Sequence, residues 1–139
     1  MLSLKEKKMS KLFYPAIFHI AEEGGYYITF PDFQNMFTQA DDMNEAYDMA
    51  QDALGLELVD LEKKKATFPV ASIPSKIKCK KDESIVIIDI DLMEYKRKTN
   101  NNAVKKTLSI PSWLNEEAIA KGINFSAVLQ KALKAELNL

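Results

Sequence analysis

The sequence feature that most constrains the fold is an isolated stretch of alternating residues, NNNAVKKTLSIPSWL, at positions 100–114. Apolar Val104, Leu108 and Ile110 alternate with polar residues, and this period of two is typical of a strand with one buried face. The chain that follows is predicted to be helical. Because a lone strand leaves its backbone N–H and C=O groups unpaired, this strand requires a partner strand from elsewhere.

Two short helices are predicted after this strand. Leu114 and Ile119 give the first helix an apolar side, and Gly122 is suited to end it. Asn124 is suited to cap the second helix. The unit formed by residues 104–139 is small for a fold that is stable alone. The apolar residues of the second helix recur at helical spacing and form a broad stripe: Phe125, Val128, Leu129, Ala132, Leu133 and Leu137.

A second copy of the chain would supply both the missing strand and the missing core. Two such strands pair antiparallel about a two-fold axis, and four helices then enclose one shared core, which is the ribbon-helix-helix arrangement. The alternative is an edge strand added to another sheet of the same chain. The predicted dimer core consists of Val104, Leu108, Ile110, Leu129 and Leu133.

The polar face of such a ribbon is suited to bind DNA. A two-stranded ribbon fits the major groove, where the outward side chains of Lys105, Thr107 and Ser109 would contact base edges. The helix that begins at Asn124 would direct backbone N–H groups at a phosphate. Lys106 lies on the apolar side of the strand, from which its long side chain could still extend to a phosphate.

The sequence pattern of residues 1–95 predicts a separate α+β domain with the element order β-β-β-α-β. Gly24-Gly25 suits a hairpin turn between the first two strands, and Pro15 suggests that part of the first strand lies at an edge or a bulge. Asp42 and Glu45 form a capping-box variant at the start of the helix. Residues 96–103 are expected to be a linker. Strands are expected at 13–20, 26–30, 36–40 and 85–92.

The net charge of −1 conceals an unequal distribution of charge along the chain. Residues 96–139 carry eight Lys and Arg residues against three Glu residues, a net charge of +5, so the preceding residues carry −6. Such asymmetry indicates two partners of opposite charge.

Several classes of protein are disfavoured by composition. The longest aliphatic run, Ile85–Ile88, is far shorter than the roughly 20 residues of a membrane span. The N-terminus lacks the apolar stretch of a signal peptide. Cys79 is the only cysteine, which leaves no internal disulfide and no cysteine cluster for a metal. We therefore expect a cytoplasmic protein with no membrane contact, no metal and no cofactor.

Several short motifs of the chain resemble those of the HicB family of type II antitoxins. The resemblance covers about residues 12–75, and residues 104–137 resemble the family's ribbon-helix-helix C-terminus. The chain departs from the family at Gln39-Ala40, where a glycine is common, and at Gln34-Asn35-Met36, where a Pro-Gly turn is usual. The shared motifs are Tyr14-Pro15-Ala16, Gly24-Gly25-Tyr26, Phe30-Pro31-Asp32, Glu45-Ala46 and Ala53-Leu54.

The resemblance implies two activities for the chain. Residues 1–95 would form a sheet domain with a partial RNase H-like or double-stranded-RNA-binding-domain-like fold. This domain would bind and inhibit a basic HicA-type toxin, which is a ribonuclease that cleaves mRNA through a histidine. Residues 104–139 would form a homodimer, or a higher oligomer, that binds inverted half-sites in operator DNA and represses its own operon. The acidic residues that we expect to face the toxin are Glu22, Glu23, Asp32, Asp41 and Asp42.

Two other functions remain open from the residues themselves. One is a ribbon-helix-helix repressor whose N-terminal domain senses a small molecule, which would need a concave apolar pocket. The other is an acidic metal-dependent nuclease, which would need carboxylates such as Asp32 and Asp89 to converge on a cation. Because Asp32 and Asp42 already have local roles as turn and cap residues, and the single histidine His19 has no evident nucleophile partner, we expect no enzymatic activity.

Overall fold

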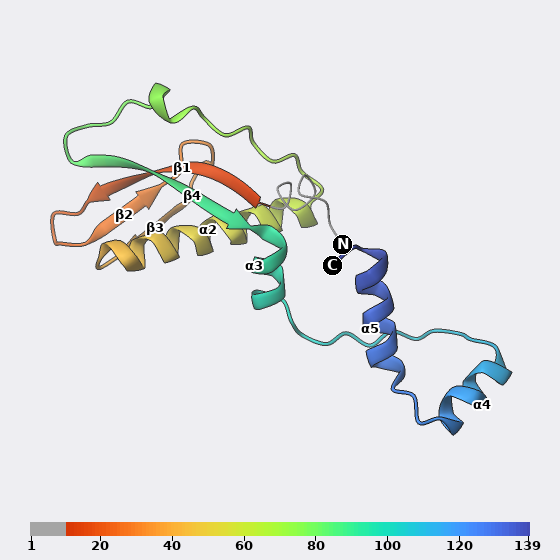
Figure 1. Ribbon diagram of the computed structural model, residues 1–139. Coiled ribbons are helices and arrows are strands. Elements are labelled where there is room, and N and C mark those ends of the chain that lie inside the picture. Colours follow the sequence, from red (N-terminus) through yellow and green to blue (C-terminus); the bar gives the residue numbers. More distant parts are fainter. Residues whose placement is uncertain (1–10) are drawn as a thin grey trace. The chain divides into compact units, whose positions relative to one another are not determined.

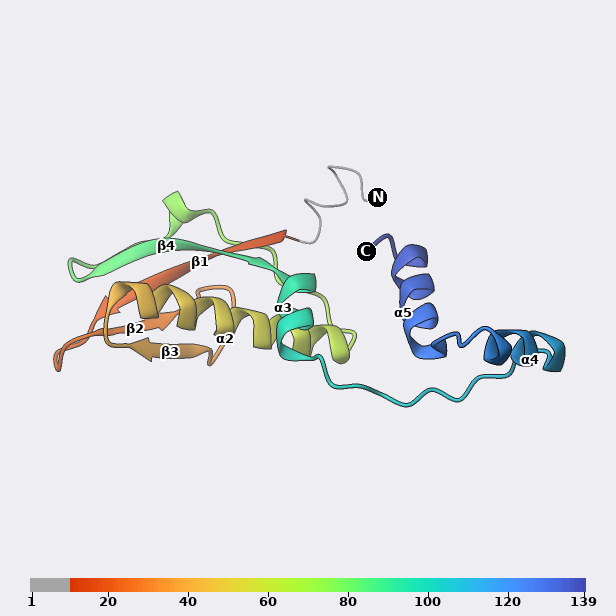
Figure 2. The ribbon, with the colours of Figure 1, turned by 60° about the horizontal axis from the view of Figure 1, so that its bottom comes forward.

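The computed structural model describes residues 11–139, which form two units (Figure 1). The first contains the described residues up to Asn101, and the second runs from Asn102 to Leu139. Figure 2 shows the sheet of the first unit with a long helix lying along it. The unit is a mixed α+β fold, and the predicted order β-β-β-α-β is confirmed. Its elements are β1 (Lys11–Ile20), β2 (Tyr26–Thr29), β3 (Phe37–Ala40), α2 (Met43–Lys63) and β4 (Glu83–Asp91).

The sheet has the strand order β3-β2-β1-β4, and each neighbouring pair is antiparallel. Gly24 and Gly25 adopt positive φ angles of 96° and 75° in the turn between β1 and β2, as the predicted hairpin requires. Pro15 lies in an inner strand, opposite Ile87 of β4, but β2 pairs with β1 only from Ile17 onward. The proline therefore occupies a part of β1 that has a strand on one side only.

Helix α2 begins with the predicted capping box. The Asp42 carboxylate accepts from the Glu45 N–H at 2.8 Å, and the Glu45 carboxylate accepts from the Asp41 N–H at 2.9 Å. Burial of each large apolar side chain stabilises the fold by about 1.5–3 kcal/mol. The fully buried residues of the helix recur every four positions, and they pack on the inner face of the sheet: Ala46, Ala50, Leu54 and Leu58 against Phe18, Ile28 and Ile88.

The segment between α2 and β4 is a loop, as expected, with one short 3-10 helix, η1 (Pro74–Lys76). It is held at two points. The Tyr14 hydroxyl donates to the Pro69 carbonyl at 2.7 Å, and the Asp32 carboxylate accepts from the Ser72 N–H at 3.0 and 3.1 Å and from the Ser72 hydroxyl.

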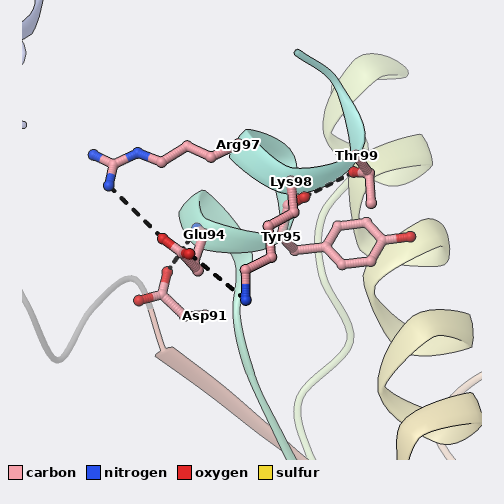
Figure 3. Close-up of polar contacts among 6 residues, drawn as sticks. All are labelled: Asp91, Glu94, Tyr95, Arg97, Lys98 and Thr99. Carbon is pink, nitrogen blue, oxygen red and sulfur yellow. Dashed lines mark hydrogen bonds and ion pairs between the residues drawn. The ribbon is translucent and has the colours of Figure 1, made fainter.

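Part of the expected linker is a helix instead, α3 (Leu92–Thr99). Asp91 caps it by accepting from the Glu94 N–H at 3.1 Å, and Thr99 donates to the Tyr95 carbonyl at 2.7 Å (Figure 3). Tyr95 packs against α2 at Gly55, where an added Cβ would lie 2.6 Å from the tyrosine ring. Residues 96–99 of the expected linker therefore belong to α3, and residues 100–103 follow this helix.

The second unit contains α4 (Ser112–Ala120) and α5 (Phe125–Glu136). As predicted, Gly122 ends α4 with a φ of +67°, and the Asn124 side chain accepts from the Ala127 N–H at 3.0 Å to cap α5. Residues 104–110 form no strand in the single chain. Within residues 102–139, all of which the structure describes, no side chain is buried.

Candidate protein- and DNA-binding surfaces

Four of the five acidic residues expected to face a protein partner lie at one end of the sheet. Tyr26, the first residue of β2, pairs with Ala40, the last residue of β3, so the β1–β2 turn lies beside the start of α2. The approach is close, because a Cβ added to Gly25 would lie 2.4 Å from the Ala40 carbonyl oxygen. We call the group formed by Glu22, Glu23, Asp41 and Asp42 the acidic end.

Two of the five expected residues have structural roles. Asp32 follows β2 at the opposite end of that strand, where its carboxylate is bonded to Ser72. Asp42 belongs to the acidic end but also caps α2. Among the described residues, Glu22, Glu23 and Asp41 are exposed and form no ion pair.

The structure also reveals an apolar surface that the sequence analysis missed. Successive side chains of a strand point to opposite faces of the sheet, and α2 covers the face that carries Phe18, Ile28 and Ile88. The strand register places a second apolar set on the other face. We call this set the open face, and it consists of Phe13, Ile17, Tyr27, Phe37, Ile85 and Ile87.

His19 lies on the open face and is held by three neighbours. Its Nε2 lies 2.9 Å from the Thr29 hydroxyl, its Nδ1 lies 3.4 Å from a Glu83 carboxylate oxygen, and its ring stacks on Tyr27 with centroids 4.2 Å apart. These contacts hold the imidazole ring in place, with its plane parallel to the Tyr27 ring.

Asp89 has partners of its own on β4. The Tyr47 hydroxyl donates to its carboxylate, and the Lys11 ammonium lies 3.4 Å away. The Tyr47 hydrogen bond, and then Lys11, hold the pKa of Asp89 below its ordinary value, whereas the same hydrogen bond and burial raise the pKa of Tyr47. Asp32, Asp42 and Asp89 are thus each bonded to a different group. Within residues 11–139, no three His, Cys, Asp or Glu side chains are grouped as metal ligands.

A hollow of about 340 Å³ lies between α2 and α3. Its lining includes four carboxylates, from Asp48, Asp52, Asp91 and Glu94, and the Tyr95 ring. Burial, and then the negative charge of Asp52, raise the pKa of Tyr95. This lining is not the apolar pocket that the small-molecule sensor reading requires.

The residues predicted to contact DNA are exposed in the second unit. Lys105, Lys106, Thr107 and Ser109 lie in the unpaired segment, and Asn124 is at the start of α5. The predicted dimer core is largely uncovered in the single chain: the exposed fractions are 86% for Val104, 58% for Leu108, 45% for Ile110 and 51% for Leu133, while Leu129 is half-buried.

Within residues 11–139, no helix is both long enough and apolar enough to cross a membrane.

Comparison with known proteins yields a family model and three informative relatives. The family model, described as HicB_like antitoxin of bacterial toxin-antitoxin system, matches residues 14–133. Antitoxin HicB 1 of Photorhabdus laumondii is 49% identical over 41 residues, which are 30% of this chain and 26% of that protein. The chain thus spans about a quarter of the length of that curated relative.

Two solved structures resemble the chain over most of its length. A chain of a toxin–antitoxin complex from Streptococcus pneumoniae has a TM-score of 0.60 and 25% identity, with coverage of 91% of this chain and 99% of that one. The antitoxin HicB of Burkholderia pseudomallei has a TM-score of 0.52 and 15% identity, with coverage of 88% and 96%, and it supports the fold alone.

Proposed function

The chain belongs to the HicB-like antitoxin family of bacterial toxin–antitoxin systems, and we propose that it inhibits a HicA-type ribonuclease toxin and represses its own operon. The first unit binds the toxin, and the second unit dimerises and binds operator DNA. The observation that carries this proposal is the similarity to a chain of the S. pneumoniae toxin–antitoxin complex over 91% of the chain. Inhibition is by covering the toxin, with no chemistry performed by this chain.

Toxin binding is assigned to the first unit because of its charge. Residues 11–101 contain 16 acidic and 11 basic residues, a net charge of −5. A surface of this sign attracts a basic partner and speeds its diffusional encounter. Glu22, Glu23 and Asp41 have no ion-pair partner within the described residues, so their charges are available to a second protein.

Charge reversal at the acidic end should slow toxin binding. We expect Glu23→Lys to lower the association rate constant by up to about tenfold at low salt and to change the dissociation rate constant little, because a rim charge acts mainly on encounter. Asp48→Lys, an exposed site on α2 with the same change in net charge, is the control. Stopped-flow binding in 20 mM and 500 mM salt provides the measurement. Equal slowing by both variants would mean that only total charge matters.

Dimerisation and DNA binding are assigned to the second unit because residues 104–110, which the sequence predicts to be a strand, and the apolar side chains of this unit are exposed in the single chain. The sheet of the first unit has four strands, β3-β2-β1-β4, and residues 104–110 are not among them. A second copy would pair these residues as a ribbon and cover Leu108 and Ile110. The polar residues between them, Lys105, Thr107 and Ser109, would then face the major groove.

Loss of a base contact should reduce operator preference. We expect Lys105→Ala and Thr107→Ala each to weaken operator binding by about 1–3 kcal/mol per site and to relax the preference at the base pair contacted. Lys134→Ala, which removes one positive charge at the end of α5, should weaken operator and scrambled duplex equally. Asn124→Ala should behave like this control, because a helix N-terminus contacts phosphate. The measurement is titration of both duplexes at one salt concentration. The ribbon assignment fails if both strand variants keep the full operator preference.

The second candidate function is a repressor whose first unit senses a ligand. In this function, too, the second unit binds DNA. It differs in requiring a small molecule in place of the toxin.

A further inference from the structure

The open face, on the side of the sheet that α2 does not cover, carries several exposed apolar side chains. Phe37 is 65% exposed, Phe13 is 53% exposed, and Ile87 and Tyr27 are 42% and 40% exposed. These residues come from all four strands, and the strand register places them on one side of the sheet. An exposed apolar surface of this kind marks a place where another molecule binds.

Three polar side chains of the open face, His19, Thr29 and Glu83, already contact one another. His19 is bonded to Thr29, lies beside Glu83 and stacks flat on Tyr27. A partner that covers this face therefore leaves His19, Thr29 and Glu83 with a polar partner each. Because the Tyr27 ring is held in place before binding, little conformational freedom is lost when it is covered.

The charges around the open face select among possible occupants. Glu22 and Glu23 lie in the turn that joins β1 to β2, and Asp82 lies at the same end, because its carbonyl accepts from the Ile20 N–H at 3.2 Å. These carboxylates repel the phosphates of a nucleic acid. A second copy would bring together two units that each carry a net charge of −5. A protein with an apolar patch bordered by Lys and Arg is attracted by both parts of this surface.

We propose that the open face is the apolar centre of the toxin interface and that the acidic end forms part of its rim. The inference rests on the proposed toxin-binding function. It adds that most of the free energy of toxin binding arises at the open face. The centre of an interface determines mainly how slowly a complex dissociates, because its side chains are fully desolvated. The charged rim determines mainly how quickly the complex forms.

The test compares two apolar residues of equal exposure on opposite sides of the first unit. Phe37 on β3 and Leu56 on α2 are both 65% exposed, so a charge at either position should leave the core intact. The full-length chain carrying Phe37→Glu or Leu56→Glu is titrated with the purified toxin encoded beside its gene. The toxin's active-site histidine is replaced by alanine so that producing cells survive. We expect Phe37→Glu to raise Kd at least about tenfold, mainly through faster dissociation, and Leu56→Glu to leave Kd unchanged.

The outcomes separate this inference from the function on which it rests. If the unmodified chain does not bind the toxin, the proposed function and the inference both fail. If the unmodified chain binds and Phe37→Glu binds equally well, or if Leu56→Glu weakens binding as much, the open face is not the centre of the interface. If Phe37→Glu changes only the oligomeric state of the antitoxin alone, the face is occupied by a second copy and the inference is overturned. Phe37→Ser replaces Phe37→Glu if the glutamate variant shows a lowered melting temperature.

Discussion

Replacing Leu129 by aspartate should leave the protein monomeric and abolish operator binding. Leu129 lies in the apolar stripe of α5 and is half-buried even in the single chain, where the side chains around it are exposed. In the proposed dimer it lies in the shared core and occurs twice. Truncation of such a side chain costs about 2–5 kcal/mol per copy, and an unpaired buried carboxylate costs more. A loss of about 4 kcal/mol already weakens a dimer by about a thousandfold.

Gln130 provides the matched control for this substitution. It is exposed, it is adjacent to Leu129 in α5, and Gln130→Asp adds the same negative charge. We expect this variant to remain a dimer and to bind the operator with only the modest loss caused by one added negative charge. Light scattering after size-exclusion chromatography gives the oligomeric state, and a titration gives operator affinity. If Leu129→Asp is still a dimer with unchanged operator affinity, α5 does not contribute to the dimer core.

Much of the first unit could be predicted from the sequence because its signals are local. The Gly24-Gly25 hairpin turn depends on backbone angles that glycine adopts without strain, and both residues have positive φ. The Asp42 cap depends on a hydrogen bond to a residue three positions away. The apolar residues of α2 recur at helical spacing, and those that face the sheet, such as Leu54 and Leu58, are buried.

Helix α3 was missed because its stabilising contacts are distant in the sequence. Tyr95 packs in the space left by Gly55, and Lys96 forms an ion pair of 2.6 Å with Glu62. Neither contact is visible as a periodic pattern within residues 92–99, which are rich in charged residues. The missing side chain of Gly55 allows the two helices to approach closely.

The candidate surfaces could be predicted only in part, because they depend on strand register. The pairing of Tyr26 with Ala40 brings Glu22 and Glu23 beside Asp41, although the residues are far apart in sequence. The same register separates Asp32 from them. Phe37 was expected in a strand, but which side of the sheet it occupies follows only from its pairing with Thr29.

The most direct test of the division of labour between the two units is a chain that ends at Asn101. This chain keeps the sheet, α2 and α3 with their buried core, and it lacks the whole second unit. We expect this truncated chain to be a monomer that binds the toxin and inhibits RNA cleavage. Its Kd for the toxin should equal the Kd of a single site of the full-length chain. It should show no operator binding at any salt concentration. Loss of toxin inhibition in a folded truncated chain, or retention of specific operator binding, would contradict the account.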